Sequence, residues 1–211
     1  MSIATSAAEQ RVIMQPVSWA TYTALSDEVT VGRGRMAYCR GVLEIMSPSK
    51  LHESVGCLIG RLVEAFTEER GIELCSVAST TFRREDLKVG FEADESYYIG
   101  DVAAVLGKDE IDLTIDPPPD LVIEVDISRS SMRKFPIYGN LRIPEVWRFH
   151  GQTLRMYVHR EGEVYDEVPQ SKVLPGLSVR ALTPFLEMQR SCGETRILRS
   201  FRQRVRNHPI A

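Results

Sequence analysis

Two carboxylates, Glu124 and Asp126, stand two residues apart near the end of an apolar segment that follows three consecutive prolines. Prolines end a helix and the β-branched residues after them favour a strand, in which alternate side chains share a face, so both acids point the same way. A segment this apolar predicts burial on both faces. Buried carboxylates need a cation, a hydrogen-bond donor or water. We therefore expect a functional site here; a solvated strand face is the alternative.

A third carboxylate, Asp94, comes just before a strand rich in tyrosine. If that strand pairs beside the strand of Glu124, the two acids converge and require a cation. Mg²⁺ suits such a site because it takes oxygen ligands and commonly uses one or two carboxylates, and Mn²⁺ is an alternative. Lys134 would supply a positive group that orients a nucleophile or stabilises a transition state. Taken alone, Lys134 is better interpreted as a solvated loop lysine.

A helix is predicted to begin near Pro48 and to end at Gly71, because apolar residues recur between them at helical spacing. His52 falls at the edge of the apolar stripe, which suits a hydrogen-bonded boundary histidine better than a catalytic one. Glu53 lies in the first turn, where a carboxylate favours the helix dipole whether or not it has another role.

The order of elements predicts one α/β or α+β domain over residues 15–190, with a mixed sheet. A loose lead-in (1–14), a short helix and a hairpin turning at Arg40-Gly41 precede the helix described above. Next come strands with a charged turn between them, a polar loop over 100–119 with glycine and proline, the Glu124 strand, a short helix and a further strand. A final hairpin over 153–169 and a closing helix complete the order.

Composition limits the class of protein. The chain has 211 residues, 43% of them hydrophobic, enough for one core, and its net charge of -3 argues against coating nucleic acid by bulk charge. It contains neither an apolar stretch of about 18 residues nor a secretory signal. Cytoplasmic location is thus expected, with no membrane and no organic cofactor. The four cysteines show no metal-binding spacing.

The segment 191–211 is rich in arginine. A solvated, partly disordered tail is the favoured interpretation, and a phosphate-contacting arm is the alternative.

Several short motifs occur in an order that resembles a known protein family. Asp94, then "DLVIEVD" with Glu124, "RKFPIY" with Lys134 and Tyr138, and "RIPEVWRF" follow in order, and "GVLEIMSPS" with His52 precedes them. This ordered set, over about residues 15–190, resembles the Uma-type restriction endonucleases of the PD-(D/E)XK nuclease superfamily. The resemblance implies a restriction endonuclease-like core, a central mixed sheet flanked by helices, with extra N-terminal and C-terminal hairpins.

By the same resemblance, Asp94, Glu124 and the carbonyl of Val125 would hold Mg²⁺ for hydrolysis of DNA phosphodiesters. Asp126 occupies the place of the superfamily's usual lysine, whose role maps instead onto Lys134, and Ala93 replaces the usual proline. His52 and Glu53 lie on the helix that faces the site in many such nucleases. Further candidates of second rank are Asp126, Tyr138 and Glu44.

The function expected is therefore a metal-dependent endonuclease, and the alternative is a nuclease-like binding or regulatory module without turnover. A nuclease needs basic residues to position phosphates, and the candidates are Arg83, Arg84 and Arg133. A homodimer is expected, because cutting a duplex takes two cuts. For Asp126 three roles remain open: a metal ligand, a partner of Lys134 or Arg133, or a neighbour that caps a helix.

Overall fold

A mixed six-stranded sheet lies at the centre of the computed structural model, which describes residues 10–29, 34–100, 102–127 and 134–207. Its strands pair in the order β11-β10-β9-β8-β7-β4, and only β8 and β9 run parallel. The bounds are β4 (Cys75–Ser76), β7 (Glu95–Tyr98), β8 (Leu121–Asp126), β9 (Glu145–His150), β10 (Thr153–His159) and β11 (Tyr165–Val168). This is the central mixed sheet that the sequence predicts.

A second, antiparallel sheet of five strands has the order β1-β3-β2-β6-β5. Its bounds are β1 (Gln10–Met14), β2 (Arg35–Cys39), β3 (Val42–Ser47), β5 (Thr81–Arg84) and β6 (Val89–Glu92). The predicted hairpin turning at Arg40-Gly41 is confirmed as β2 and β3, with positive φ at both turn residues. A whole second sheet was not predicted, because the sequence does not give which strands pair; the segment of β5 was predicted as a strand, whereas part of β6 was assigned to the charged turn.

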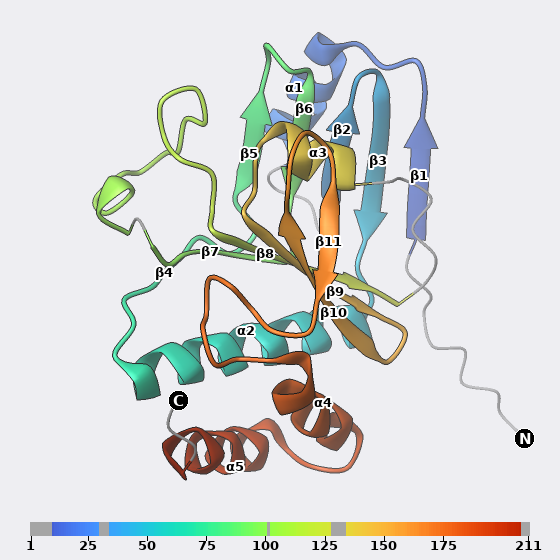
Figure 1. Ribbon diagram of the computed structural model, residues 1–211. Helices are drawn as coiled ribbons and strands as arrows, with labels where there is room; N and C mark the ends of the chain where they lie inside the picture. The colour runs from blue at the N-terminus through green and yellow to red at the C-terminus, as the bar shows by residue number, and fades with distance from the viewer. Residues whose placement is uncertain (1–9, 30–33, 101, 128–133, 208–211) are drawn as a thin grey trace, which may run out of the picture.

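Helices α2 (Lys50–Arg70), α4 (Val179–Glu187) and α5 (Glu194–Asn207) cover one face of the six-stranded sheet, and α3 (Phe135–Asn140) and the five-stranded sheet, with α1 (Trp19–Val29) against it, lie toward the other (Figure 1). The short 3-10 turns are η1 (Val102–Ala104) and η2 (Met188–Arg190). Leu121, Ile123 and Val125 of β8 pack on the helical side, whereas Val122 packs on the side of α3 and the five-stranded sheet. The alternation predicted for this strand is therefore confirmed.

The long helix α2 is defined by its caps. The Ser49 side chain accepts the His52 backbone N–H, and Gly71 closes the helix with a left-handed φ of 64°. The predicted stop at Gly71 is confirmed. Pro48, however, precedes the cap and is not in the first turn, because Ser49 provides the acceptor that starts the helix.

Both ends of the described chain are more ordered than the sequence suggests. Part of the lead-in forms β1, paired with β3, and most of the arginine-rich segment forms α5. Ile197, Phe201 and Val205, spaced four residues apart, bury one face of α5 in the core beside α2. The solvated tail was thus a wrong prediction, since the arginines mask this apolar stripe. No helix among the described residues is long and apolar enough to span a bilayer.

Candidate active site

The site forms where β7 and β8 meet. In the antiparallel pairing of these strands Glu95 is opposite Ile123, so the same register continued by one residue places Asp94 opposite Glu124. Both carboxylates are buried, with residue exposures of 5% for Asp94 and 4% for Glu124. The strand pairing on which the predicted convergence depended is therefore confirmed.

Asp94 is held by three donors from separate elements. Its Oδ1 lies 2.8 Å from His52 Nε2 on α2 and 3.1 Å from an Arg35 guanidinium nitrogen on β2. Its Oδ2 accepts the Val125 backbone N–H at 2.6 Å. The same Arg35 nitrogen also donates to Glu53 at 2.7 Å. Asp94 is thus fixed against both the long helix and the strand of Glu124.

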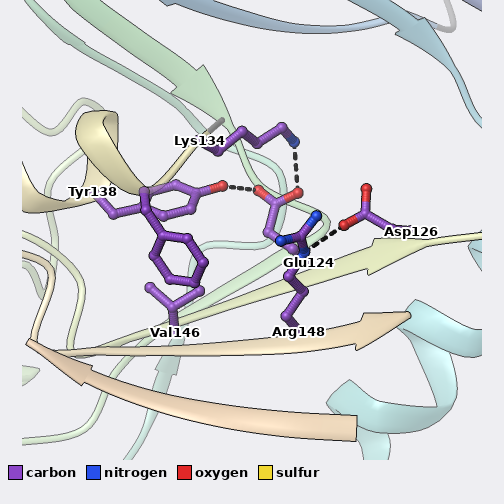
Figure 2. Close-up of a pocket in the computed structure, with 7 residues that line it drawn as sticks. Glu124, Asp126, Lys134, Tyr138, Val146 and Arg148 are labelled. Atoms are coloured by element: carbon purple, nitrogen blue, oxygen red, sulfur yellow. Dashed lines mark hydrogen bonds and ion pairs between the residues drawn. The ribbon is translucent and has the colours of Figure 1, made fainter. Parts of the chain in front are cut away.

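Glu124 is held by two donors, one from the residue just before α3 and one from α3 itself (Figure 2). Lys134 Nζ donates to Glu124 Oε2 at 2.5 Å, and the Tyr138 hydroxyl donates to Oε1. Lys134 immediately precedes α3 and Tyr138 lies in its middle, so one short helix supplies both partners. The sequence placed these two residues among the candidates, and the structure brings both to Glu124.

Burial and charge shift the protonation of the two acids in opposite directions. Burial alone would raise the pKa of Asp94, but the His52 hydrogen bond and the charges of His52, Arg35 and Lys134 outweigh it and lower the pKa. Burial raises the pKa of Glu124, and the nearby charge of Asp94 adds to this, against the charge of Lys134. Burial lowers the pKa of Lys134, but Glu124 and Asp94 more than compensate and raise it. The site therefore favours a charged Lys134 and an ionised Asp94.

Asp126 belongs to a neighbouring group of ions. It accepts Arg148 Nε at 2.6 Å and an Arg11 guanidinium nitrogen at 3.2 Å, and Arg11 also donates to Glu44 at 2.9 Å. Lys134 was one of the partners considered for Asp126 from the sequence. It lies near enough that the charge of Asp126 raises the pKa of Lys134, but the hydrogen bonds that Asp126 accepts come from Arg148 and Arg11. Arg133 lies outside the described residues.

A pocket of about 20 Å³ opens between these groups, with room for about one water molecule. The residues that line it are Glu124, Asp126, Lys134, Phe135, Tyr138, Val146 and Arg148. Figure 2 shows the Lys134 ammonium bonded to the Glu124 carboxylate and the Arg148 guanidinium bonded to Asp126. The pocket thus joins a buried acid, a buried lysine and a second cation.

The residues suit a divalent ion in charge and in ligand type. Asp94 and Glu124 offer carboxylate oxygens, which Mg²⁺ prefers, and the Val125 backbone lies beside them. Each of the four carboxylate oxygens accepts a protein donor, so an ion bound at Glu124 Oε2 would compete with the Lys134 ammonium for that oxygen. Within the part of the chain that the structure describes, no three His, Cys, Asp or Glu side chains cluster as a metal site.

The remaining candidates are placed as follows. His52 is fully buried and not at a boundary, because its ring nitrogen forms a hydrogen bond with the buried Asp94. Half of the Glu53 side chain is exposed, and it reaches the site only through Arg35. Arg83 pairs with Asp27 and Arg84 with Asp86, and neither arginine lines the pocket at Glu124.

Sequence reasoning missed three arginines, Arg11, Arg35 and Arg148. The sequence pattern could have indicated only Arg148. It shares a strand face with Val146 and His150, on a strand next to that of Glu124. Arg11 and Arg35 come from strands whose pairing the sequence does not give, and neither lies near Asp94, Glu124 or Asp126 along the chain. Their positions therefore follow only from the tertiary structure.

Comparison with known proteins agrees with this geometry. The chain is similar to a solved putative nuclease belonging to DUF820 from Anabaena variabilis, with 12% identity and a TM-score of 0.53 over 81% of this chain and 99% of the other. At that identity the likeness shows the fold alone, and it supports the restriction endonuclease-like architecture. No curated protein matches the chain. The model of the Uma2 family, described as putative restriction endonuclease, matches residues 19–193. The chain therefore belongs to the Uma2 family of putative restriction endonucleases.

Proposed function

We propose that the chain is a metal-dependent endonuclease that hydrolyses DNA phosphodiester bonds. The observation that carries the proposal is the buried pair Asp94 and Glu124 on neighbouring strands, with Lys134 hydrogen-bonded to Glu124 beside a pocket the size of one water molecule. Burying two acids and a lysine is costly, and such a cost is more often met at a functional site than in a core.

In this proposal each residue has a definite task. Asp94, Glu124 and the Val125 carbonyl would hold Mg²⁺ or Mn²⁺, which when bound lowers the pKa of water and neutralises phosphate charge. Lys134 keeps its proton and directs it toward the pocket, where it can orient a water or stabilise negative charge on the phosphate. His52 and Arg35 hold Asp94 in its ionised form and fix its orientation.

The test is nicking and linearisation of supercoiled plasmid in Mg²⁺, Mn²⁺ or chelator. We expect metal-dependent cleavage that falls by at least about 100-fold in Asp94→Asn, Glu124→Gln and Lys134→Met. Asp166→Asn is the control, since this partly exposed acid pairs with the exposed Arg160 on the C-terminal hairpin. Thermal unfolding of each variant separates loss of chemistry from loss of fold. Cleavage that survives Glu124→Gln would disprove the proposed site.

The second candidate function is a nuclease-like module that binds nucleic acid without turnover. It is favoured by one observation: every oxygen of Asp94 and Glu124 already accepts a protein donor, so the site is charge-balanced without an ion. DNA binding by the intact protein, with no cleavage in either metal and no metal binding by calorimetry, would select this function.

We also propose that the protein acts as a homodimer, because duplex cleavage requires a cut in each strand. Light scattering coupled to size exclusion should give twice the chain mass. A monomer mass at working concentration would contradict the dimer without affecting the proposed chemistry.

A further inference from the structure

One face of the six-stranded sheet carries the acids of the site on β8 and, on the neighbouring strands β9 and β10, a set of basic and polar side chains. In the parallel pairing of β8 and β9, Glu124 is opposite Arg148 and Asp126 is opposite His150. In the antiparallel pairing of β9 and β10, Arg148 is opposite Arg155. Since paired residues share a face, Glu124, Arg148 and Arg155 form a row that runs outward from the buried site.

This outward continuation is hollowed. A depression of about 320 Å³ is lined by Arg148, His150, Thr153, Arg155 and Tyr157. Arg148 also lines the small pocket at Glu124, so the two hollows adjoin. We call the five lining residues the β9–β10 track. It contains no acidic side chain, and its exposed members offer donors.

Two arginines directly opposite on neighbouring strands repel each other and weaken the sheet. Arg148 is compensated by Asp126 at 2.6 Å. Among the described residues, the acid that pairs with Arg155 is Glu167 at 3.3 Å, and more than half of each of these side chains is exposed. An exposed pair of this length is weak and exchanges readily for another anion. The pair of arginines is thus better explained by a bound anion than by its contribution to the sheet.

We propose that the β9–β10 track binds the phosphodiester backbone of the nucleic acid next to the bond that Glu124 and Lys134 act on. The inference rests on the proposed function and adds to it where the substrate lies. Arg155 would take a phosphate in place of Glu167, and Thr153 and His150 can donate to its oxygens. Arg148, still paired with Asp126, would connect that phosphate to the pocket at Glu124. The arginines predicted from the sequence at 83 and 84 lie on β5, outside the track.

The test measures binding apart from cleavage. Fluorescence anisotropy of the intact protein is followed with a labelled DNA duplex, and with an RNA duplex of the same sequence, in chelator at several salt concentrations. Arg155→Gln is compared with Arg160→Gln, an exposed arginine on the same hairpin that loses the same charge but does not line the track. Arg155→Lys restores the charge.

We expect Arg155→Gln to weaken binding about fivefold and to reduce by about one the slope of the logarithm of the binding constant against the logarithm of the salt concentration. Arg155→Lys should partly restore binding, and Arg160→Gln should change it little. The same result with RNA would support the track and identify RNA as an acceptable source of the phosphates. Equal losses in Arg155→Gln and Arg160→Gln, or a wild-type protein that binds neither duplex, would overturn the track. If binding depends on Arg155 but the protein does not cleave, the track is retained and the nuclease is rejected. If the protein cleaves but its binding does not depend on Arg155, the nuclease is retained and the track is rejected.

Discussion

Two consecutive acids, Asp94 and Glu95, show how position decides protonation at the scale of single residues. Burial of Asp94 is outweighed by His52, Arg35 and Lys134, which lower its pKa. Burial instead raises the pKa of Glu95 to about 7, and the charges of Glu64 and Asp94 add to the effect. The reason is alternation along the strand, which turns Asp94 toward cations and Glu95 toward Gly60 and Glu64 of α2.

Glu95 should therefore make the folded protein less stable as pH rises. The unfolded chain ionises this carboxyl near the ordinary glutamate pKa of 4.5, whereas the folded chain keeps the proton until about pH 7. The free energy of unfolding then decreases between those pH values, because the unfolded state releases its proton first. We expect Glu95→Gln to flatten this decrease and to raise stability at pH 8 by about 1 kcal/mol, a value reduced for the partial exposure of the group.

Urea denaturation between pH 4.5 and 8 measures the effect. Glu187→Gln, at an exposed position on α4, is the control and should keep the wild-type profile. Parallel pH profiles for wild type and Glu95→Gln would show that Glu95 titrates normally.

At the scale of elements, the site depends on a helix too short to be stable alone. α3 has six residues, yet it carries Tyr138 and directly follows Lys134. Its position is set by packing: Ile137 lies in the core between the sheets, and Gly139 lies against the loop that joins β10 to β11. The contacts of Glu124 are thus controlled from the C-terminal hairpin.

Gly139 should tolerate no side chain. A Cβ there would lie 2.5 Å from the Glu163 Cα and 2.7 Å from the Gly162 carbonyl oxygen, both backbone atoms that cannot rotate away. We expect Gly139→Ala to cost about 2–3 kcal/mol of stability and to lower cleavage by moving Tyr138 and Lys134 away from Glu124. Gly193→Ala, which meets nothing within 4 Å, is the matched control for thermal unfolding and activity. Wild-type stability in Gly139→Ala would refute this account of how α3 is placed.

At the scale of the whole molecule, α5 completes the layer of helices beneath the six-stranded sheet (Figure 1). Its apolar face meets α2 and α4, with the Phe201 and Phe185 rings 5.1 Å apart and edge to face. Two of its arginines, Arg202 and Arg206, bind Glu69 of α2. The arginine-rich segment therefore helps to close the core, whatever else it contacts.

Phe201→Ala should destabilise the whole protein by about 3–4 kcal/mol, because the ring is buried and its loss leaves a cavity. Arg199→Ala, on the exposed side of the same helix, should change stability by no more than about 0.5 kcal/mol. Chemical denaturation followed by tryptophan fluorescence compares the two. Similar small losses would mean that α5 is not part of the cooperative fold.

Local patterns in the sequence were sufficient for much of the site. Period-two alternation placed Glu124 and Asp126 on one face, period 3.6 gave α2, and a glycine stop ended it. These signals act over a few residues, so they can be found without knowing the fold. Lys134 and Tyr138, at and just after the start of a short helix, became candidates through the family resemblance and not through a local pattern.

Only the tertiary structure decided which partners these residues have. Arg35 meets Asp94 across 59 positions and Arg11 meets Asp126 across 115, through pairings in two sheets whose order no local pattern encodes. The burial of His52 and the β9–β10 track also depend on strand register between distant segments. The sequence determined which carboxylates could do chemistry and that Glu124 and Asp126 share a strand face. Strand pairing decided which charges meet, because each charge in a buried site is balanced by groups that are close in space and distant along the chain.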